Sequence, residues 1–166
     1  SHIQNPQSLL EIGSAYGHLL LEAKKQGWTQ VSGVEFSDEA IKVCHNKGLE
    51  VVKNLSGLSS QIYEAVAIYS VLEHFANPAK FLLELKNFCQ SSTLIFIRVP
   101  KMSEAGPWLS LLDHFWHFSE DSLARLLDHC GYKILETFPS GKFLGIQHSG
   151  ILESFTAVCQ LKDINN

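Results

Sequence analysis

Two short apolar segments, each followed by a polar turn, constrain the fold of this chain more than any other feature. Residues 9–12 (LLEI) lead into a small-residue turn at 13–17 (GSAYG), and residues 31–34 lead into the acid Glu35. The separation from the end of the turn to Glu35 is close to the roughly 20 residues of one strand–helix–strand step. Such a turn lets the backbone approach a ligand closely, and the acid can accept hydrogen bonds from ribose hydroxyls. The pattern therefore predicts a cleft for a nucleoside-bearing cofactor.

The details of the turn favour one nucleoside over another. A dinucleotide fingerprint reads G-x-G-x-x-G and places a helix N-terminus against a pyrophosphate. Here the spacing is Gly13-x-x-x-Gly17, with Ala15 where a central glycine is usual, and Glu11 stands two residues before the first glycine. A carboxylate at that place repels phosphate but suits the positive ammonium and sulfonium groups of S-adenosylmethionine. The turn therefore disfavours NAD and favours S-adenosylmethionine.

The length and the net charge of the chain limit the number of domains and the kinds of partner that it can have. The 166 residues predict one domain spanning 1–166, large enough to bury roughly 70% of its unfolded surface. The net charge is −4 and the 13 basic residues are scattered, which argues against a nucleic-acid partner. No apolar run approaches the roughly 18 residues of a membrane span, and no secretory signal is visible. We therefore expect a cytoplasmic protein that contacts neither nucleic acid nor membrane.

The cysteines support a reducing compartment. Cys44, Cys89, Cys130 and Cys159 are widely spaced, and no two of them form a C-x-x-C pair. Each falls within an expected helix or strand, so buried free thiols fit the pattern better than metal ligands or disulfides.

Strand and helix patterns alternate along the chain. Residues 65–69 are nearly all apolar, as in a central parallel strand that is covered on both faces. Ser37, Asn77 and Ser119 are expected to cap helices. Five strand–helix steps and a terminal strand pair fit an α/β fold, a doubly wound and mostly parallel sheet with its cleft at the carboxyl ends of the strands. The expected strands are 8–12, 31–35, 50–53, 65–69, 93–99, 132–138 and 151–160; the expected helices are 18–26, 37–46, 77–88 and 119–130.

Several segments resemble the class I S-adenosylmethionine-dependent methyltransferases. Residues 11–17 resemble motif I of that superfamily, E/D-x-G-x-G-x-G, and residues 34–40 (VEFSDEA) are similar to its second motif. Residues 63–78 (YEAVAIYSVLEHFANP) resemble the fourth motif, F-D-x-V-x-x-x-x-V-L-E-H-x-x-x-P. Residues 114–132 resemble the late H-x-x-x-F-S/T segment of a small-molecule subgroup, some of whose members modify sugars or quinone precursors.

The resemblance implies a Rossmann-like, three-layer sheet of seven strands in the order 3-2-1-4-5-7-6, with the last strand antiparallel. A helix that commonly precedes the first strand of the family and helps to cover the cofactor has no counterpart here, which suggests a minimal member or a domain of a longer chain. By resemblance, the turn lines the cofactor, Glu35 holds the ribose, Phe36 packs on adenine and Ser70 with Val71 forms the floor near the methyl group. The expected cofactor-binding set is Glu11, Gly13, Ser14, Ala15, Tyr16, Gly17, Glu35, Phe36, Ser37, Asn54, Ser70 and Val71.

Methyl transfer needs alignment of the acceptor and, for a hydroxyl acceptor, a base. Histidine is the natural base near neutral pH, and His74 and His114 are the expected catalytic residues, with His117 behind them. The alternatives stay open: His74 could cap the following helix, and residues 115–118 could form a hydrophobic lid.

A metal site is a further alternative. Some methyltransferases for quinone precursors or small RNAs resemble this chain in carrying E-x-x-E-H after the fourth strand and a later histidine, which together hold a divalent ion. Here Ser70 takes the place of the first acid, so only Glu73, His74 and one of His114 or His117 remain. The sequence therefore predicts no dedicated metal site.

The expected function is methyl transfer from S-adenosylmethionine to a small-molecule acceptor at O, N or C, with S-adenosylhomocysteine as product. The alternative is a catalytically silent relative that serves as a binding or docking module, and NAD-dependent redox chemistry is a disfavoured third reading. Residues 101–112 are expected to shape the acceptor pocket, but neither the acceptor nor the oligomeric state follows from the sequence.

Overall fold

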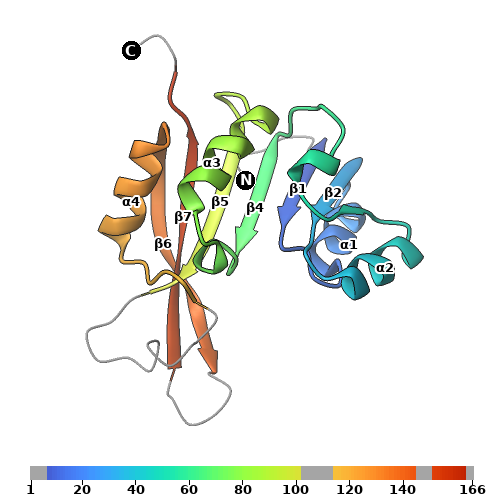
Figure 1. Cartoon of the computed structure of the whole chain (residues 1–166), viewed down its shortest axis with the longest axis horizontal. Helices are drawn as coiled ribbons and strands as arrows, with labels where there is room; N and C mark the ends of the chain where they lie inside the picture. The colour runs from blue at the N-terminus through green and yellow to red at the C-terminus, as the bar shows by residue number, and fades with distance from the viewer. Residues whose placement is uncertain (1–6, 102–113, 145–150, 164–166) are drawn as a thin grey trace.

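The fold of this chain, taken from a computed structural model, is one twisted sheet with helices against it (Figure 1). The structure describes residues 7–101, 114–144 and 151–163. The seven strands follow the order β3-β2-β1-β4-β5-β7-β6, which confirms the expected topology. The elements are β1 (Ser8–Ile12), α1 (His18–Lys25), β2 (Gln30–Val34), α2 (Asp38–Asn46), β3 (Glu50–Val52), η1 (Leu55–Gly57), β4 (Ala65–Tyr69), η2 (Leu72–His74), α3 (Pro78–Leu85), η3 (Lys86–Phe88), β5 (Leu94–Pro100), α4 (Glu120–His129), β6 (Tyr132–Leu144) and β7 (Ile151–Leu161).

The strand register brings the predicted site segments to one edge of the sheet. β1 pairs in parallel with β2 and with β4, so that Ile12 lies between Val34 and Ile68. β4 pairs in parallel with β5, whereas β7 runs antiparallel to both β5 and β6. Because the carboxyl ends of β1, β2 and β4 are level, the residues that follow these three strands meet at a topological switch point.

Two buried clusters occupy opposite faces of the sheet, since side chains alternate along each strand. The consecutive residues Leu9 and Leu10 of β1 belong to different clusters. The cluster that includes Leu10 also contains buried residues of α3 and α4, and the cluster that includes Leu9 contains buried residues of α1 and α2. In Figure 1, α1 and α2 accordingly lie near β1 and β2, while α3 and α4 lie toward the β4–β6 half.

The helix starts agree with the expected caps. The Ala40 amide donates to Ser37 Oγ, and the Lys80 amide donates to Asn77 Oδ1 at 2.9 Å. Ser119 and Ser122 form a reciprocal capping box at the start of α4. Asn77, and not His74, therefore caps α3, which removes the capping alternative for His74. None of the helices within the described ranges is long and apolar enough to cross a bilayer.

Three features depart from the expected elements. The short turns η1 and η2 were not expected, and β6 continues to Leu144 instead of ending near residue 138. The longer strand is possible because β6 pairs with β7 throughout, with register shifts at Ile134/Glu136 and at Pro139/Lys142 that absorb the proline. The predicted acceptor segment falls, from residue 102 onward, outside the described residues.

Candidate active site

The turn after β1 is held against β2 by its own backbone. The amides of Gly13 and Ser14 both donate to the Val34 carbonyl, at 2.7 and 3.1 Å, and the Gly17 amide donates to the Ser14 carbonyl at 2.8 Å. Gly13 has φ +74°, and a Cβ at this position would lie 2.3 Å from Val71 Cγ2. The backbone can pass this close to the segment after β4 only because residue 13 has no side chain.

Glu35 holds the same turn from the other side. Its Oε2 accepts a hydrogen bond from the Ala15 amide at 2.8 Å, and its Oε1 accepts one from the Ser37 amide at 2.8 Å. Ala15 has a left-handed φ of +45°, so this bond fixes a conformation that an alanine does not favour. A carboxylate has about four acceptor positions, and each Glu35 oxygen can therefore accept a further hydrogen bond from a ligand hydroxyl.

A cavity of about 780 Å³ opens at the switch point and brings many of the predicted residues together. Its volume is within the usual range for a small-molecule site, roughly 300–1,000 Å³. The predicted cofactor residues that line it are Gly13, Ala15, Glu35, Phe36, Asn54, Ser70 and Val71. The cavity therefore joins the segments after β1, β2, β3 and β4.

The other predicted cofactor residues lie around the cavity and do not line it. Ser14 is buried, Gly17 leads into α1, Tyr16 is exposed, and Ser37 caps α2. Glu11 lies beneath the turn in β1 and is only 8% exposed. The predicted cofactor residues therefore fall into two groups, those that line the cavity and those that support it from outside.

The Glu11 carboxyl is the most perturbed acid of the site. Burial, with a smaller contribution from the charge of Glu35, raises its pKa from 4.5 to about 8, although a hydrogen bond from the Leu20 backbone opposes the shift. Its Oε2 has no hydrogen-bond partner among the described residues. The free protein therefore keeps this carboxyl protonated at neutral pH, and a cation beside it would lower its pKa and favour the charged form, whereas a phosphate would not.

One end of the cavity presents an aromatic ring and a cation. Phe36 is 82% exposed, and Lys53 Nζ lies 5.6 Å from the centre of its ring. Lys53 also pairs with Asp38 at 2.6 Å. The sequence analysis named Phe36 and Asn54 here but missed Lys53, Lys80 and Glu84, which line the same cavity. The signal for Lys53 was available, because it directly precedes Asn54 at the end of a strand.

The floor of the cavity follows β4. Ser70 has a left-handed φ of +55°, and its amide donates to the Arg98 carbonyl of β5 at 2.9 Å. Tyr69, another lining residue that sequence reasoning missed, lies under the Arg98 guanidinium, whose central carbon is 5.0 Å from the ring centre. Burial raises the pKa of Tyr69, so its hydroxyl stays protonated at neutral pH. The positive φ of Ser70 directs the chain from β4 into η2.

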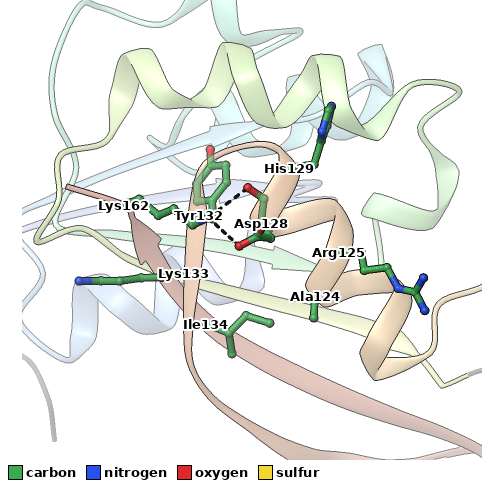
Figure 2. A pocket seen from close by; sticks show the side chains of 8 residues that line it. All are labelled: Ala124, Arg125, Asp128, His129, Tyr132, Lys133, Ile134 and Lys162. Carbon is green, nitrogen blue, oxygen red and sulfur yellow. Dashed lines mark hydrogen bonds and ion pairs between the residues drawn. The ribbon is translucent and has the colours of Figure 1, made fainter. Parts of the chain in front are cut away.

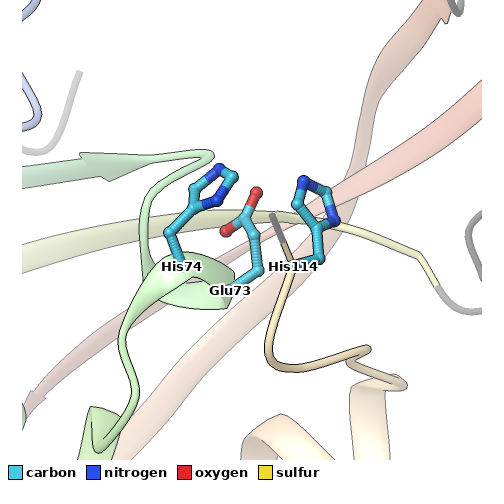
Figure 3. Close-up of side chains that lie close together, drawn as sticks. All are labelled: Glu73, His74 and His114. Atoms are coloured by element: carbon cyan, nitrogen blue, oxygen red, sulfur yellow. The ribbon is translucent and has the colours of Figure 1, made fainter. Parts of the chain in front are cut away.

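The predicted catalytic residues His74 and His114 meet beside this floor. Their ring centres are 4.6 Å apart in an edge-on arrangement, and His117 lies one step further, 6.1 Å from His114. Figure 3 shows the Glu73 carboxylate between the two imidazoles, with all three side chains pointing the same way. Val71 and Phe75, which flank η2, both line the cofactor cavity. Neither His74 nor His114 lines the cavity itself.

A second cavity, of about 600 Å³, lies between α4 and the start of β6 (Figure 2) and contains none of the predicted residues. Its cations already have acidic partners: Lys162 pairs with Asp128 at 2.6 Å, and Arg125 pairs with Asp121. The charges on this surface therefore largely compensate one another, and the sequence analysis predicted no functional site there.

The residues present fit S-adenosylmethionine. The buried Glu11 carboxyl suits a positive ligand, the backbone at Gly13 leaves room for close approach, and Glu35 retains acceptor positions for ribose hydroxyls. Phe36 offers an exposed ring to a flat base.

Comparisons with known proteins identify the family and the fold. The sequence matches the family described as "Methyltransferase domain" over residues 2–137, so the chain belongs to that family. Family and fold together define a class I S-adenosylmethionine-dependent methyltransferase. A search of curated proteins found no match.

Solved structures share the fold at low sequence identity. A putative methyltransferase from Bacillus halodurans is 12% identical with a TM-score of 0.79, and 97% of this chain and 95% of that chain are covered. A methyltransferase from Methanosarcina mazei is 16% identical with a TM-score of 0.75 and the same coverage. The 1,6-didemethyltoxoflavin-N1-methyltransferase of Burkholderia thailandensis, solved with 1,6-didemethyltoxoflavin and S-adenosylhomocysteine bound, is 16% identical with a TM-score of 0.73; 96% of this chain and 72% of that chain are covered.

Proposed function

We propose that this methyltransferase transfers a methyl group from S-adenosylmethionine to a small-molecule acceptor by in-line displacement. The observation that carries the proposal is the single cavity that joins the turn at Gly13 and Ala15, the Glu35 carboxylate, and the floor at Ser70 and Val71. The structural neighbour from Burkholderia thailandensis acts on a small molecule, which supports the same acceptor class here.

Within this cavity each predicted residue has a separate task. Glu35 accepts from the ribose hydroxyls while it keeps the turn in place through the Ala15 amide. Phe36 covers the adenine, and Glu11, which is protonated in the free protein at neutral pH, becomes the negative partner of a cationic ligand whose charge lowers its pKa. When bound, S-adenosylmethionine supplies an electrophilic methyl group: the acceptor lone pair forms the bond to carbon while the carbon–sulfur electrons stay on sulfur. The protein contributes mainly alignment, because the donor is already activated.

The acceptor side is assigned to the histidines beside η2. A hydroxyl acceptor must lose its proton, and the paired imidazoles of His74 and His114 are the groups near η2 that can assist. His117 lies behind them and borders an adjoining groove of about 520 Å³ with Trp116 and Phe118. We assign assistance of proton removal to the first two.

The alternative is a catalytically silent domain that serves as a docking module. One observation favours it: the two Glu35 oxygens already accept backbone hydrogen bonds, so the turn is held without a ligand. Cofactor binding separates the two functions.

Isothermal titration calorimetry with S-adenosylhomocysteine and, separately, NAD tests the proposal. We expect the wild type to bind S-adenosylhomocysteine and not NAD. Glu35→Gln replaces one of the two acceptor oxygens with an NH₂ group. The loss of one hydrogen bond to a charged group costs about 1.5–3 kcal/mol, which predicts roughly 10- to 100-fold weaker binding of S-adenosylhomocysteine. Glu39→Gln, on the exposed first turn of α2, is the matched control and should bind like the wild type. Absence of heat with either ligand would support the silent domain, and NAD binding alone would refute the assignment.

The cytoplasm remains our proposed location. The four cysteines are buried and free, which is the state expected in a reducing compartment.

A further inference from the structure

The end of α2 contacts the cofactor turn at two main-chain carbonyls. The Cys44 thiol donates to the Ala15 carbonyl at 3.3 Å. The Lys47 ammonium donates to the Tyr16 carbonyl at 2.8 Å. Cys44 belongs to α2, and Lys47 directly follows the last residue of this helix. We propose that Cys44 and Lys47 are positioning residues, which hold the turn in the conformation that binds the cofactor. This inference rests on the proposed function, because cofactor affinity is the property that they control.

The Cys44 side chain packs against the turn from within the protein. It is 0% exposed, and a Cβ at Gly17 would lie 3.0 Å from its sulfur. Burial raises the pKa of the Cys44 thiol, so the thiol stays protonated at neutral pH and keeps the S–H that the hydrogen bond requires. Cys44 is therefore a permanent donor to the Ala15 carbonyl.

Residue 15 is the part of the turn that most needs support. Ala15 has φ +45°, a left-handed conformation that an L-residue does not favour. Glu35 Oε2 accepts from its amide at 2.8 Å, while Cys44 donates to its carbonyl. Both polar main-chain groups of Ala15 are thus held by side chains. A glycine adopts positive φ without this strain, so the requirement for Cys44 depends on the alanine at position 15.

The same hydrogen bond sets the orientation of the following peptide group. In a planar trans peptide the Tyr16 amide points opposite to the Ala15 carbonyl, and therefore away from Cys44. A turn that is ordered in advance costs the ligand little ordering entropy when it binds. Without the thiol or the ammonium, the free turn adopts more conformations and the cofactor has to order it. Neither Cys44 nor Lys47 lines the cavity, so both act on the ligand through the turn.

Calorimetry with S-adenosylhomocysteine on substituted forms of the whole chain tests the role of the thiol. Cys44→Ala and Cys44→Ser differ by one hydroxyl, which can donate to the Ala15 carbonyl in place of the thiol. We expect roughly 3- to 10-fold weaker binding for Cys44→Ala, and an affinity within about twofold of the wild type for Cys44→Ser. Cys130→Ala is the matched control. It removes another buried cysteine, whose thiol donates to the Ala79 carbonyl at 3.8 Å in the cluster of α3 and α4, and should leave the affinity unchanged.

The ammonium is tested in the same way. Lys47 is exposed, so its hydrogen bond is partly replaced by water, and Lys47→Met should weaken binding about threefold. Lys42→Met removes another exposed lysine of α2 and should bind like the wild type.

A double-mutant cycle with Ala15→Gly separates positioning from general stability. Since glycine at position 15 needs no support, Cys44→Ala should weaken binding by less than about twofold in the Ala15→Gly background. A purely structural role of Cys44 would lower the urea midpoint in both backgrounds and leave the dissociation constant of the folded protein unchanged. If Cys44→Ala fails to fold, Cys44→Val takes its place, because valine fills the site and has no donor.

The outcomes distinguish this inference from the proposed function. A wild type that binds S-adenosylhomocysteine, with equal affinity in Cys44→Ala and Lys47→Met, would overturn the positioning role alone. Equal losses in Cys44→Ala and Cys44→Ser, or in Cys44→Ala and Cys130→Ala, would also overturn it. Absence of binding in the wild type would refute the proposed function, and the inference with it.

Discussion

The close approach of the Gly13 backbone to Val71 predicts a large effect for Gly13→Ala. The Cβ of the new alanine would lie 2.3 Å from Val71 Cγ2, and residue 13 has φ +74°. The left-handed conformation costs an L-residue about 1–2 kcal/mol. Displacing Val71 from a packed position adds about 1–3 kcal/mol. We therefore expect Gly13→Ala to lower the free energy of unfolding by roughly 2–5 kcal/mol.

Gly48→Ala is a control for the backbone contribution. Gly48 has φ +70°, nearly the value of Gly13, but a Cβ there would meet no atom within 4 Å. This substitution should lower the free energy of unfolding by about 1–2 kcal/mol only. The difference between the two variants therefore measures the contact with Val71.

Urea unfolding of Gly13→Ala, Gly48→Ala, Val71→Ala and the double variant Gly13→Ala/Val71→Ala gives these values. In the double variant the contact is removed, so the coupling free energy between the two positions should be stabilising by about 1–3 kcal/mol. Calorimetry should also show weaker binding of S-adenosylhomocysteine to Gly13→Ala, since Val71 lines the cavity. Equal destabilisation by Gly13→Ala and Gly48→Ala would refute the reasoning.

Three further predictions concern single side chains. Ala15→Gly should raise the free energy of unfolding by about 0.5–1 kcal/mol, because relief of the left-handed strain at φ +45° exceeds the added entropy of the unfolded chain; a lower urea midpoint would contradict this. The pKa of Glu11 is raised from 4.5 to about 8, so the folded protein retains a proton that the unfolded chain loses. Glu11 therefore lowers the free energy of unfolding as the pH rises from about 4.5 to about 8. Glu11→Gln should remove that dependence in urea titrations, and identical pH profiles of variant and wild type would count against it. Tyr132→Phe removes the buried bond from the Tyr132 hydroxyl to the Leu82 carbonyl, 2.6 Å long, and should cost about 1–3 kcal/mol in thermal unfolding; an unchanged midpoint would argue that this bond contributes nothing.

The sequence predicted the sheet well because its signals are local. Alternating strand and helix patterns, helix caps and the acid after β2 are each contained in a few neighbouring residues, and the resemblance to a known family supplied the strand order. β1 and β4 consequently have the expected bounds. The turns η1 and η2 were missed, because three residues are too few to show a periodicity.

The site was predictable only as far as it follows from strand ends. Glu35 and Ser70 come directly after a strand and Val71 follows Ser70, so parallel pairing alone brings them together. The bond from the Ala15 amide to Glu35, and the hydrogen bonds from residues 115 and 116 to the Glu73 carbonyl, join segments far apart in the chain. Such contacts depend on how loops pack against one another, which neither spacing nor composition encodes.

Backbone strain within the described residues is concentrated where the cavity needs it. Ala15 and Ser70 are the non-glycine residues there with positive φ, and both line the cavity. Each comes shortly after a central strand, and each is fixed by a hydrogen bond of its amide, to Glu35 and to the Arg98 carbonyl. Strained residues of this kind cost on the order of 1–3 kcal/mol each and persist only where the surroundings determine them. β1 and β4 are neighbours in the sheet interior, so they provide a rigid base from which both turns can be held open toward a ligand.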